Sequence, residues 1–129
     1  MLGNLAQFNM EITEFAKRVP EEAAELQRKI VLAAFVKISD RTPVLTGRAR
    51  GNWIPTIGSP AEYAFDRIDP TGTMSKAELI AMLPSIPPFS VCYISNNVNY
   101  IIFLEEGSSQ KAPAGMVAVT IEELWEMFK

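Results

Sequence analysis

The first third of the chain carries apolar residues at a spacing that a helix places on one face. From residue 30 to residue 36 the sequence IVLAAFV is then apolar at every position. A helix that is apolar on all sides has to be covered on all sides, which in a chain of this size is a first sign of association with another chain. The residues that establish the helical face recur at intervals of four, three and four and are Phe8, Ile12, Phe15 and Val19.

Pro20 indicates where a second helix begins. Proline is favoured in the first turn of a helix, and Glu21 and Glu22 follow it, where the positive end of the helix dipole favours acidic side chains. In this second helix we expect Leu26 and Ile30 to face inward. The sequence therefore predicts two consecutive N-terminal helices that meet at Pro20.

Two short runs further along the chain predict strands. Residues 39–52 are expected to form a loop, because Pro43 disfavours continuation of the helix. The run NWIPTI (52–57) predicts a strand that Pro55 confines to a sheet edge. The run FSVCYISNN (89–97) is the best strand of the chain, since β-branched and aromatic residues lead into a turn-forming pair.

Helices are expected again after the first strand. Residues 58–88 form a long excursion, in which Ser75 and Glu78 match a capping box and predict a short helix that Pro84 ends. A C-terminal helix is predicted by apolar residues at intervals of four, three and four: Val117, Ile121, Leu124 and Phe128. Residues 1–129 thus predict one α+β domain, with long N-terminal helices packed on a small antiparallel β-sheet, a short inserted helix and a C-terminal helix.

The composition argues against several classes of function. The chain has no histidine and a single cysteine, Cys92, which removes the usual general base, an intrachain disulfide and a thiolate metal cage. Its net charge of −3 argues against a generally cationic surface for nucleic acid. No apolar stretch reaches the roughly 18 residues that cross a bilayer, and the first residues lack the basic start of a signal peptide. We therefore expect no membrane partner and a cytoplasmic site of synthesis.

The two halves of the chain differ in charge. Residues 1–60 carry eight Lys or Arg against six Asp or Glu, and residues 61–129 carry four against nine. Such asymmetry suits subunits that present faces of opposite sign to each other, although a merely solvated surface explains it equally well.

The acidic residues do not form a convincing catalytic or metal site. Glu62, Asp66 and Asp69 fall in a turn-rich segment, where a solvated surface explains them better than a two-metal centre. Glu105 and Glu106 are adjacent and would point to different sides of a helix. We therefore predict no catalytic residue, no cofactor and no metal ion.

The stretch RTPVLTGRARGNW (41–53), preceded by Lys37, is the strongest local positive patch. It fits a solvated loop, a nucleic-acid contact in which Trp53 stacks on a base, or a subunit interface. Arginine and tryptophan are the residue types most enriched at binding hot spots, which favours the interface formed by Arg41, Arg48 and Arg50.

This patch forms part of one of two sequence motifs that resemble the signatures of a known protein family. TPVLTGRARGNW resembles the TP-x-x-TG-x-(L/A)-R-x-(S/N)-W signature of small tail-component proteins of long-tailed bacteriophages. NNVNYIIFLEEGSS (96–109) is similar to their second signature, Asn-x-x-x-Tyr-x-x-x-(Leu/Val)-Glu-x-Gly-(Ser/Thr)-Ser, which leads through a proline-containing loop into a final helix. Both motifs occur in the expected order, whereas residues 58–88 lack a clear counterpart and resemble an insertion.

The resemblance implies a non-enzymatic virion structural protein of the head–tail junction, called a neck, tail-completion or head–tail joining protein. Relatives of this kind form rings, commonly six-fold, that complete or terminate the tail tube and join it to the head connector. The implied partners are further copies of the chain in a hexameric or larger ring, the tail tube protein and the connector or adaptor proteins, with double-stranded DNA only as passing cargo. The implied location is the virion, after assembly in the bacterial cytoplasm. The alternative is a small DNA-binding or packaging accessory protein that uses Arg48 and Arg50.

The expected site follows from the two motifs and their charged neighbours. We expect Thr46 and Gly47 to form a tight turn that aims Arg48 and Arg50 outward, and Glu105 to accept a bidentate bond from an arginine of the same or the next subunit. The oligomer or partner interface is expected to contain Arg41, Thr46, Gly47, Arg48, Arg50, Glu105, Glu106, Ser108 and Lys111. The expected structural anchors are Trp53, Tyr100, Leu104 and Gly107, and the second signature also carries over Asn96.

Overall fold

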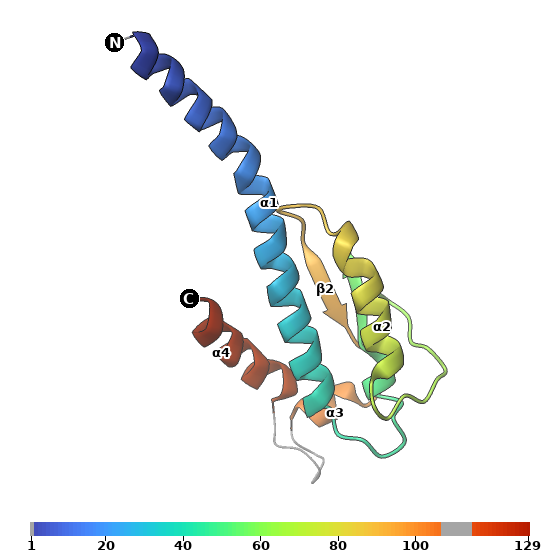
Figure 1. Cartoon of the computed structure of the whole chain (residues 1–129). Helices are drawn as coiled ribbons and strands as arrows, with labels where there is room; N and C mark the ends of the chain where they lie inside the picture. The colour runs from blue at the N-terminus through green and yellow to red at the C-terminus, as the bar shows by residue number, and fades with distance from the viewer. Residues whose placement is uncertain (1, 107–114) are drawn as a thin grey trace.

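The computed structural model describes residues 2–106 and 115–129, with side chains from residue 10 onward. It shows the predicted α+β class, in which a long N-terminal helix packs beside a small antiparallel sheet (Figure 1). The elements in chain order are α1 (Leu2–Arg41), η1 (Arg50–Asn52), β1 (Ile54–Ile57), α2 (Thr73–Met82), η2 (Leu83–Ser85), β2 (Cys92–Ser95), α3 (Ile101–Glu105) and α4 (Met116–Phe128).

Helix α1 is continuous, and the predicted break at Pro20 is wrong. The proline lies inside a helix of 40 residues, although it removes one backbone hydrogen bond from the helical ladder. The residues on both sides of Pro20 are mainly Ala, Glu, Lys, Arg and Gln, which are strong helix formers. Their preference allows the helix to pass through the proline.

The C-terminal half of α1 supplies the centre of the core. Val31, Phe35 and Ile38 pack with Trp53 and with two further buried residues, Leu79 of α2 and Met116 of α4. In Figure 1, α2 and the sheet lie on one side of this half of α1, and α4 lies on the other. Leu26, which was expected to face inward, is half exposed, because it lies at the rim of a shallow hollow between α1 and Phe89 and is only partly covered by the body.

The sheet consists of two short antiparallel strands. Ile54 of β1 pairs with Ser95 of β2, and Ile57 pairs with Cys92. Pro55 lies within β1, which agrees with the prediction of an edge strand because both strands of a two-stranded sheet are edges.

The N-terminal half of α1 extends away from the rest of the molecule (Figure 1). Among the described side chains of α1, Ala24 is the first that is buried. Three large apolar side chains before it are exposed to 68%, 49% and 57%: Met10, Ile12 and Phe15. From residue 10 to residue 18, every described side chain of the projecting helix is exposed.

The segment 58–88 is packed into the body. It contributes Leu79 and Ile86, which are fully buried. The predicted capping box is wrong, because α2 begins two residues before Ser75 and its first amides donate to the carboxylate of Asp69, which lies earlier in the chain.

Helix α4 is present, but only part of its predicted apolar stripe is covered. Val117, Leu124 and Phe128 are half-buried. Ile121 is 60% exposed, and Trp125, one turn later, is 71% exposed. Met116 and Val117 pack in or against the core, and polar contacts with α1 add to this packing.

Candidate functional site

The first motif begins with a buried hydrogen-bond chain. The indole Nε1 of Trp53 donates to Oγ1 of Thr42 over 2.7 Å, and the same hydroxyl donates to the carbonyl of Ile38 over 2.7 Å. Trp53 is 4% exposed and Thr42 is 1% exposed. A buried indole needs such a partner, so Thr42 fixes the position of Trp53 against the end of α1.

Gly47 makes the tight turn that the sequence predicted. Its φ of +96° is accessible to glycine and costly for other residues. A Cβ at this position would lie 2.5 Å from the backbone nitrogen of Pro70. The carbonyl of Gly47 accepts bonds from the amides of Gly51 and Asp69, each over 3.0 Å. The turn therefore holds the loop before α2 against the first motif.

Arg50 does not point outward, and that expectation is wrong. Its guanidinium donates to the carbonyl of Pro70 over 2.7 Å and to those of Thr42 and Asp40 over 2.9 and 3.2 Å. Backbone carbonyls at the end of α1 and before α2 converge on the Arg50 side chain. Its guanidinium has five N–H donors and can therefore bind several carbonyls at once. Arg50 therefore ties three parts of the chain together.

Two asparagines connect the motifs to their surroundings. Asn52 is fully buried; its amide nitrogen donates to the carbonyls of Arg48 and Phe65, and its Oδ1 accepts the amide of Phe65. Asn96 of the second motif donates to the carbonyl of Ala49 in the first over 2.9 Å. The resemblance carried over Asn96 from the second motif, and the structure places its side chain against the backbone of the first motif.

Arg41, expected at a partner interface, is used within the chain. It donates to Oγ1 of Thr120 over 3.1 Å and forms an ion pair with Glu123, to which Lys37 also donates over 2.8 Å. The hydrogen bonds from Arg41 and then Lys37 lower the pKa of Glu123 from 4.5 to about 2. These cations of α1 thus hold α4 in place, a role that nothing in the spacing of Lys37 and Glu123 revealed.

Glu105 does not take an arginine as expected. Its Oε1 accepts the amide of Val117 over 2.8 Å and its Oε2 accepts the amide of Ala118 over 3.2 Å. These are first-turn amides of α4, which have no partner within the helix, and a carboxylate there also matches the helix dipole. The glutamate of the second motif therefore caps the final helix.

A smaller set of the predicted interface residues remains on the surface. Thr46 and Glu106 are exposed and Arg48 is partly exposed. Leu45, which precedes them in the loop, is 85% exposed. The guanidinium of Arg48 makes no hydrogen bond or ion pair with the described part of the chain. These residues are available to a partner, whereas Ser108 and Lys111 lie outside the described residues.

The predicted anchors differ in burial. Trp53 lies in the core, Leu104 is half-buried and packs against the core cluster, and Tyr100 is half-buried. Gly107 lies outside the described residues.

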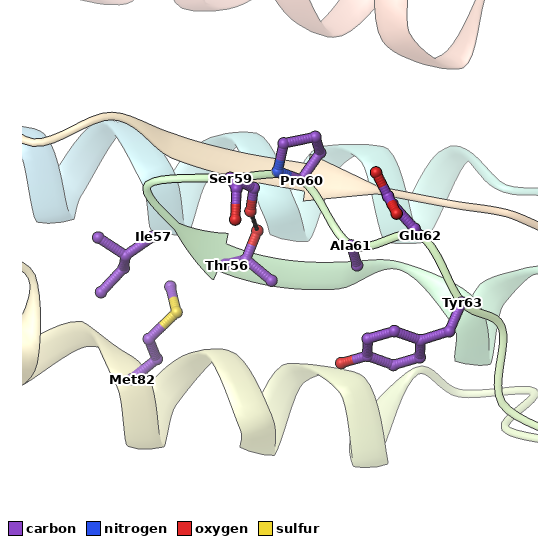
Figure 2. A pocket seen from close by; sticks show the side chains of 8 residues that line it. All are labelled: Thr56, Ile57, Ser59, Pro60, Ala61, Glu62, Tyr63 and Met82. Atoms are coloured by element: carbon purple, nitrogen blue, oxygen red, sulfur yellow. Dashed lines mark hydrogen bonds between the residues drawn. The ribbon is translucent and has the colours of Figure 1, made fainter.

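A shallow hollow of about 690 Å³ lies beside β1, under the loop that leads out of this strand (Figure 2). Glu62 is the one carboxylate among its lining side chains, so no pair of carboxylates faces the hollow. The lining residues are Thr56, Ile57, Ser59, Pro60, Ala61, Glu62, Tyr63 and Met82.

Glu62, Asp66 and Asp69 do not act together in the structure. Asp69 caps α2, whereas Glu62 and Asp66 are exposed. Over residues 2–106 and 115–129, no three potential ligands gather in a way that would hold a metal ion.

Within the same described ranges, no helix combines the length and the hydropathy that crossing a membrane requires. Comparison of the chain with protein-family models, with curated proteins and with solved structures finds no match.

Proposed function

We propose that this chain is a non-enzymatic structural protein of the bacteriophage virion, which forms a ring at the head–tail junction. In this role it completes or terminates the tail tube and joins it to the head connector. The type of assembly is suggested by the resemblance of the two motifs to those of small tail-component proteins.

The observation that carries the proposal is the projecting half of α1. It presents Met10, Ile12 and Phe15 to solvent, and large exposed apolar side chains on a continuous element are typical of contact surfaces. Most helical stability in proteins comes from tertiary packing of an apolar face, so contact with another chain would stabilise the projecting half. A protein that assembles with other chains, whether further copies or virion partners, would cover this surface, whereas a protein that acts alone would leave it exposed.

The first motif supports the same role in a different way. Its buried residues stiffen the end of α1 through Thr42, Gly47 and Trp53, while Leu45, Thr46 and Arg48 stay accessible on the loop. A rigid frame that presents a short loop suits binding to a fixed partner. We assign contact with the neighbouring subunit, the tail tube or the connector to this loop.

The direct test is assembly on isolated phage parts. Purified protein is incubated with tail tubes that lack their terminal ring and with portal–connector complexes, and both are viewed by electron microscopy. We expect a ring at one end of the tube or on the connector. Leu45→Asp should abolish attachment, whereas Ile68→Asp, an exposed apolar position outside both motifs, should not. A protein that attaches to neither part refutes the proposal.

The DNA-binding alternative depended on Arg48 and Arg50 together. Because Arg50 donates to three backbone carbonyls, only Arg48 of this pair remains available for a phosphate. Binding to duplex DNA that weakens steeply with salt and is lost in Arg48→Ala would favour this alternative over the structural role.

A further inference from the structure

The projecting half of α1 carries a heptad pattern that is independent of both motifs. Ile12, Phe15 and Val19 follow at intervals of three and four residues, and Leu26 lies one heptad beyond Val19. Ile12, Phe15 and Leu26 are each exposed to about half or more. In heptad notation Ile12 and Val19 occupy a positions and Phe15 the d position between them, the seam along which two helices pair. The next d position is Glu22, so the apolar seam of the projecting half ends at Val19.

We propose that this seam binds a second copy of the same chain, with the projecting halves of the two α1 helices side by side and antiparallel. The inference does not rest on the proposed virion role. Such a contact is isologous and is saturated by two copies, so it differs from the head-to-tail contact that closes a ring.

Charges beside the seam select the antiparallel register. The g positions are Glu11, Arg18 and Glu25, and antiparallel helices bring g positions of the two chains together. With Ile12 opposite Phe15 of the second copy, Glu11 lies opposite Arg18, and by symmetry Arg18 lies opposite Glu11. Residues at g positions set orientation and partner choice in coiled coils.

The neighbouring registers are disfavoured. A shift of one heptad in one direction places Arg18 opposite Arg18 and Glu11 opposite Glu25. A shift in the other direction places Glu11 opposite Glu11. A parallel in-register pair would set Glu11 beside Ala16 and form no ion pair at all. Of the arrangements compared, only the register with Ile12 opposite Phe15 places acid opposite base at both g contacts.

The residues that this pairing needs are accessible. Glu11 is exposed. The Arg18 side chain is 61% exposed, and its ion pair with Glu22 over 3.2 Å lies on the surface. An exposed pair of this kind contributes little, so Arg18 exchanges Glu22 for Glu11 of a second copy at small cost. Ala16 is small and lies beside the seam, which allows a close approach of the two helices.

The test measures the mass of the full-length protein against concentration by sedimentation equilibrium. We expect a reversible change from one chain of 14.3 kDa to twice that mass. Glu11→Lys and Arg18→Glu should each weaken pairing roughly ten-fold, because two attractive contacts become repulsive. The combined variant Glu11→Lys, Arg18→Glu should restore pairing, since the charges are exchanged rather than lost.

Matched controls lie on the same helix. Glu14→Lys and Lys17→Glu make the same charge changes at outward positions and should leave the mass curve unchanged, with helicity verified by circular dichroism for every variant. A wild-type chain that stays at 14.3 kDa, or a combined variant that pairs no better than the single ones, overturns the proposal. Larger species that do not respond to the charge variants overturn it as well. Ring formation on tail tubes is measured separately, so either inference can fail alone.

Discussion

At Gly47 the backbone lies so close to Pro70 that a Cβ would clash with it. Glycine is therefore required at this position for steric reasons as well as for its positive φ. We predict that Gly47→Ala lowers the free energy of unfolding by about 2–4 kcal/mol, because a strained φ and a steric overlap add. The matched control is Gly58→Ala, where φ is +88° and no atom lies within 4 Å of the added Cβ; it should cost about 1 kcal/mol. Urea titration gives both values, and equal losses would show that the approach to Pro70 is unimportant.

Arg48 and Arg50 are two positions apart and have different tasks. Arg50→Ala should lower the free energy of unfolding by about 1–3 kcal/mol, because the buried part of its hydrogen-bond network is left without donors. Arg48→Ala should change stability by no more than about 0.5 kcal/mol and weaken only attachment to the partner. Thermal unfolding and the assembly assay separate the two effects. If the Arg50→Ala protein were as stable as the wild type but failed to assemble, Arg50 would be a contact residue for the partner and not a structural residue.

Sequence reasoning succeeded where a residue's own chemistry decides its position. Gly47 and Trp53 were predicted as a turn and an anchor, because glycine permits positive φ and tryptophan favours burial. Arg41, Arg50 and Glu105 were expected to bind a partner, yet each finds its own partners in the chain. Those partners are distant in the sequence. A local sequence pattern therefore cannot predict which carbonyl or amide group the fold brings next to each side chain.

Among the elements, α4 depends on polar contacts at both its start and its middle. At its start, Glu105→Ala removes the acceptor of two amides and should lower stability by about 1 kcal/mol. The amides of Val117 and Ala118 should then exchange faster with deuterium. Glu106→Ala, at an exposed position, is the control and should change neither quantity. Unchanged exchange in Glu105→Ala would mean that the cap does not hold the helix end.

In the middle of α4, Glu123 makes stability depend on pH. Its pKa is about 2 in the folded chain and 4.5 as an ordinary glutamate. The folded state therefore binds fewer protons, and the contribution of Glu123 is fully present above pH 4.5 and is lost as pH falls toward 2. Melting temperatures between pH 6 and pH 2 should fall more steeply for the wild type than for Glu123→Gln. If the melting temperatures of the two proteins fell in parallel with pH, Glu123 would not contribute to the loss of stability in acid.

The helical elements also show where the periodicity of the sequence misleads. Pro20 was expected to separate two helices, and the strong helix formers around it outweigh that signal. The spacing of apolar residues predicted an amphipathic C-terminal helix, but Ile121 of that stripe is exposed, and the buried residues of α4 are Met116 and Thr120. Spacing shows that a helix is amphipathic, and tertiary contacts decide which side is covered.

For the molecule as a whole, we expect the projecting half of α1 to be needed for pairing with a second copy and not for folding of the body. The described side chains of residues 10–18 are all exposed, so deletion of residues 2–18 should leave the body intact. We expect the near-ultraviolet signal of Trp53 to persist, and the melting temperature of the monomer to change by no more than a few degrees. Over the same concentrations the shortened chain should remain a monomer. Loss of the Trp53 signal in the shortened chain would show that the projecting helix supports the core. A shortened chain that still pairs would show that the contact between copies lies on another surface.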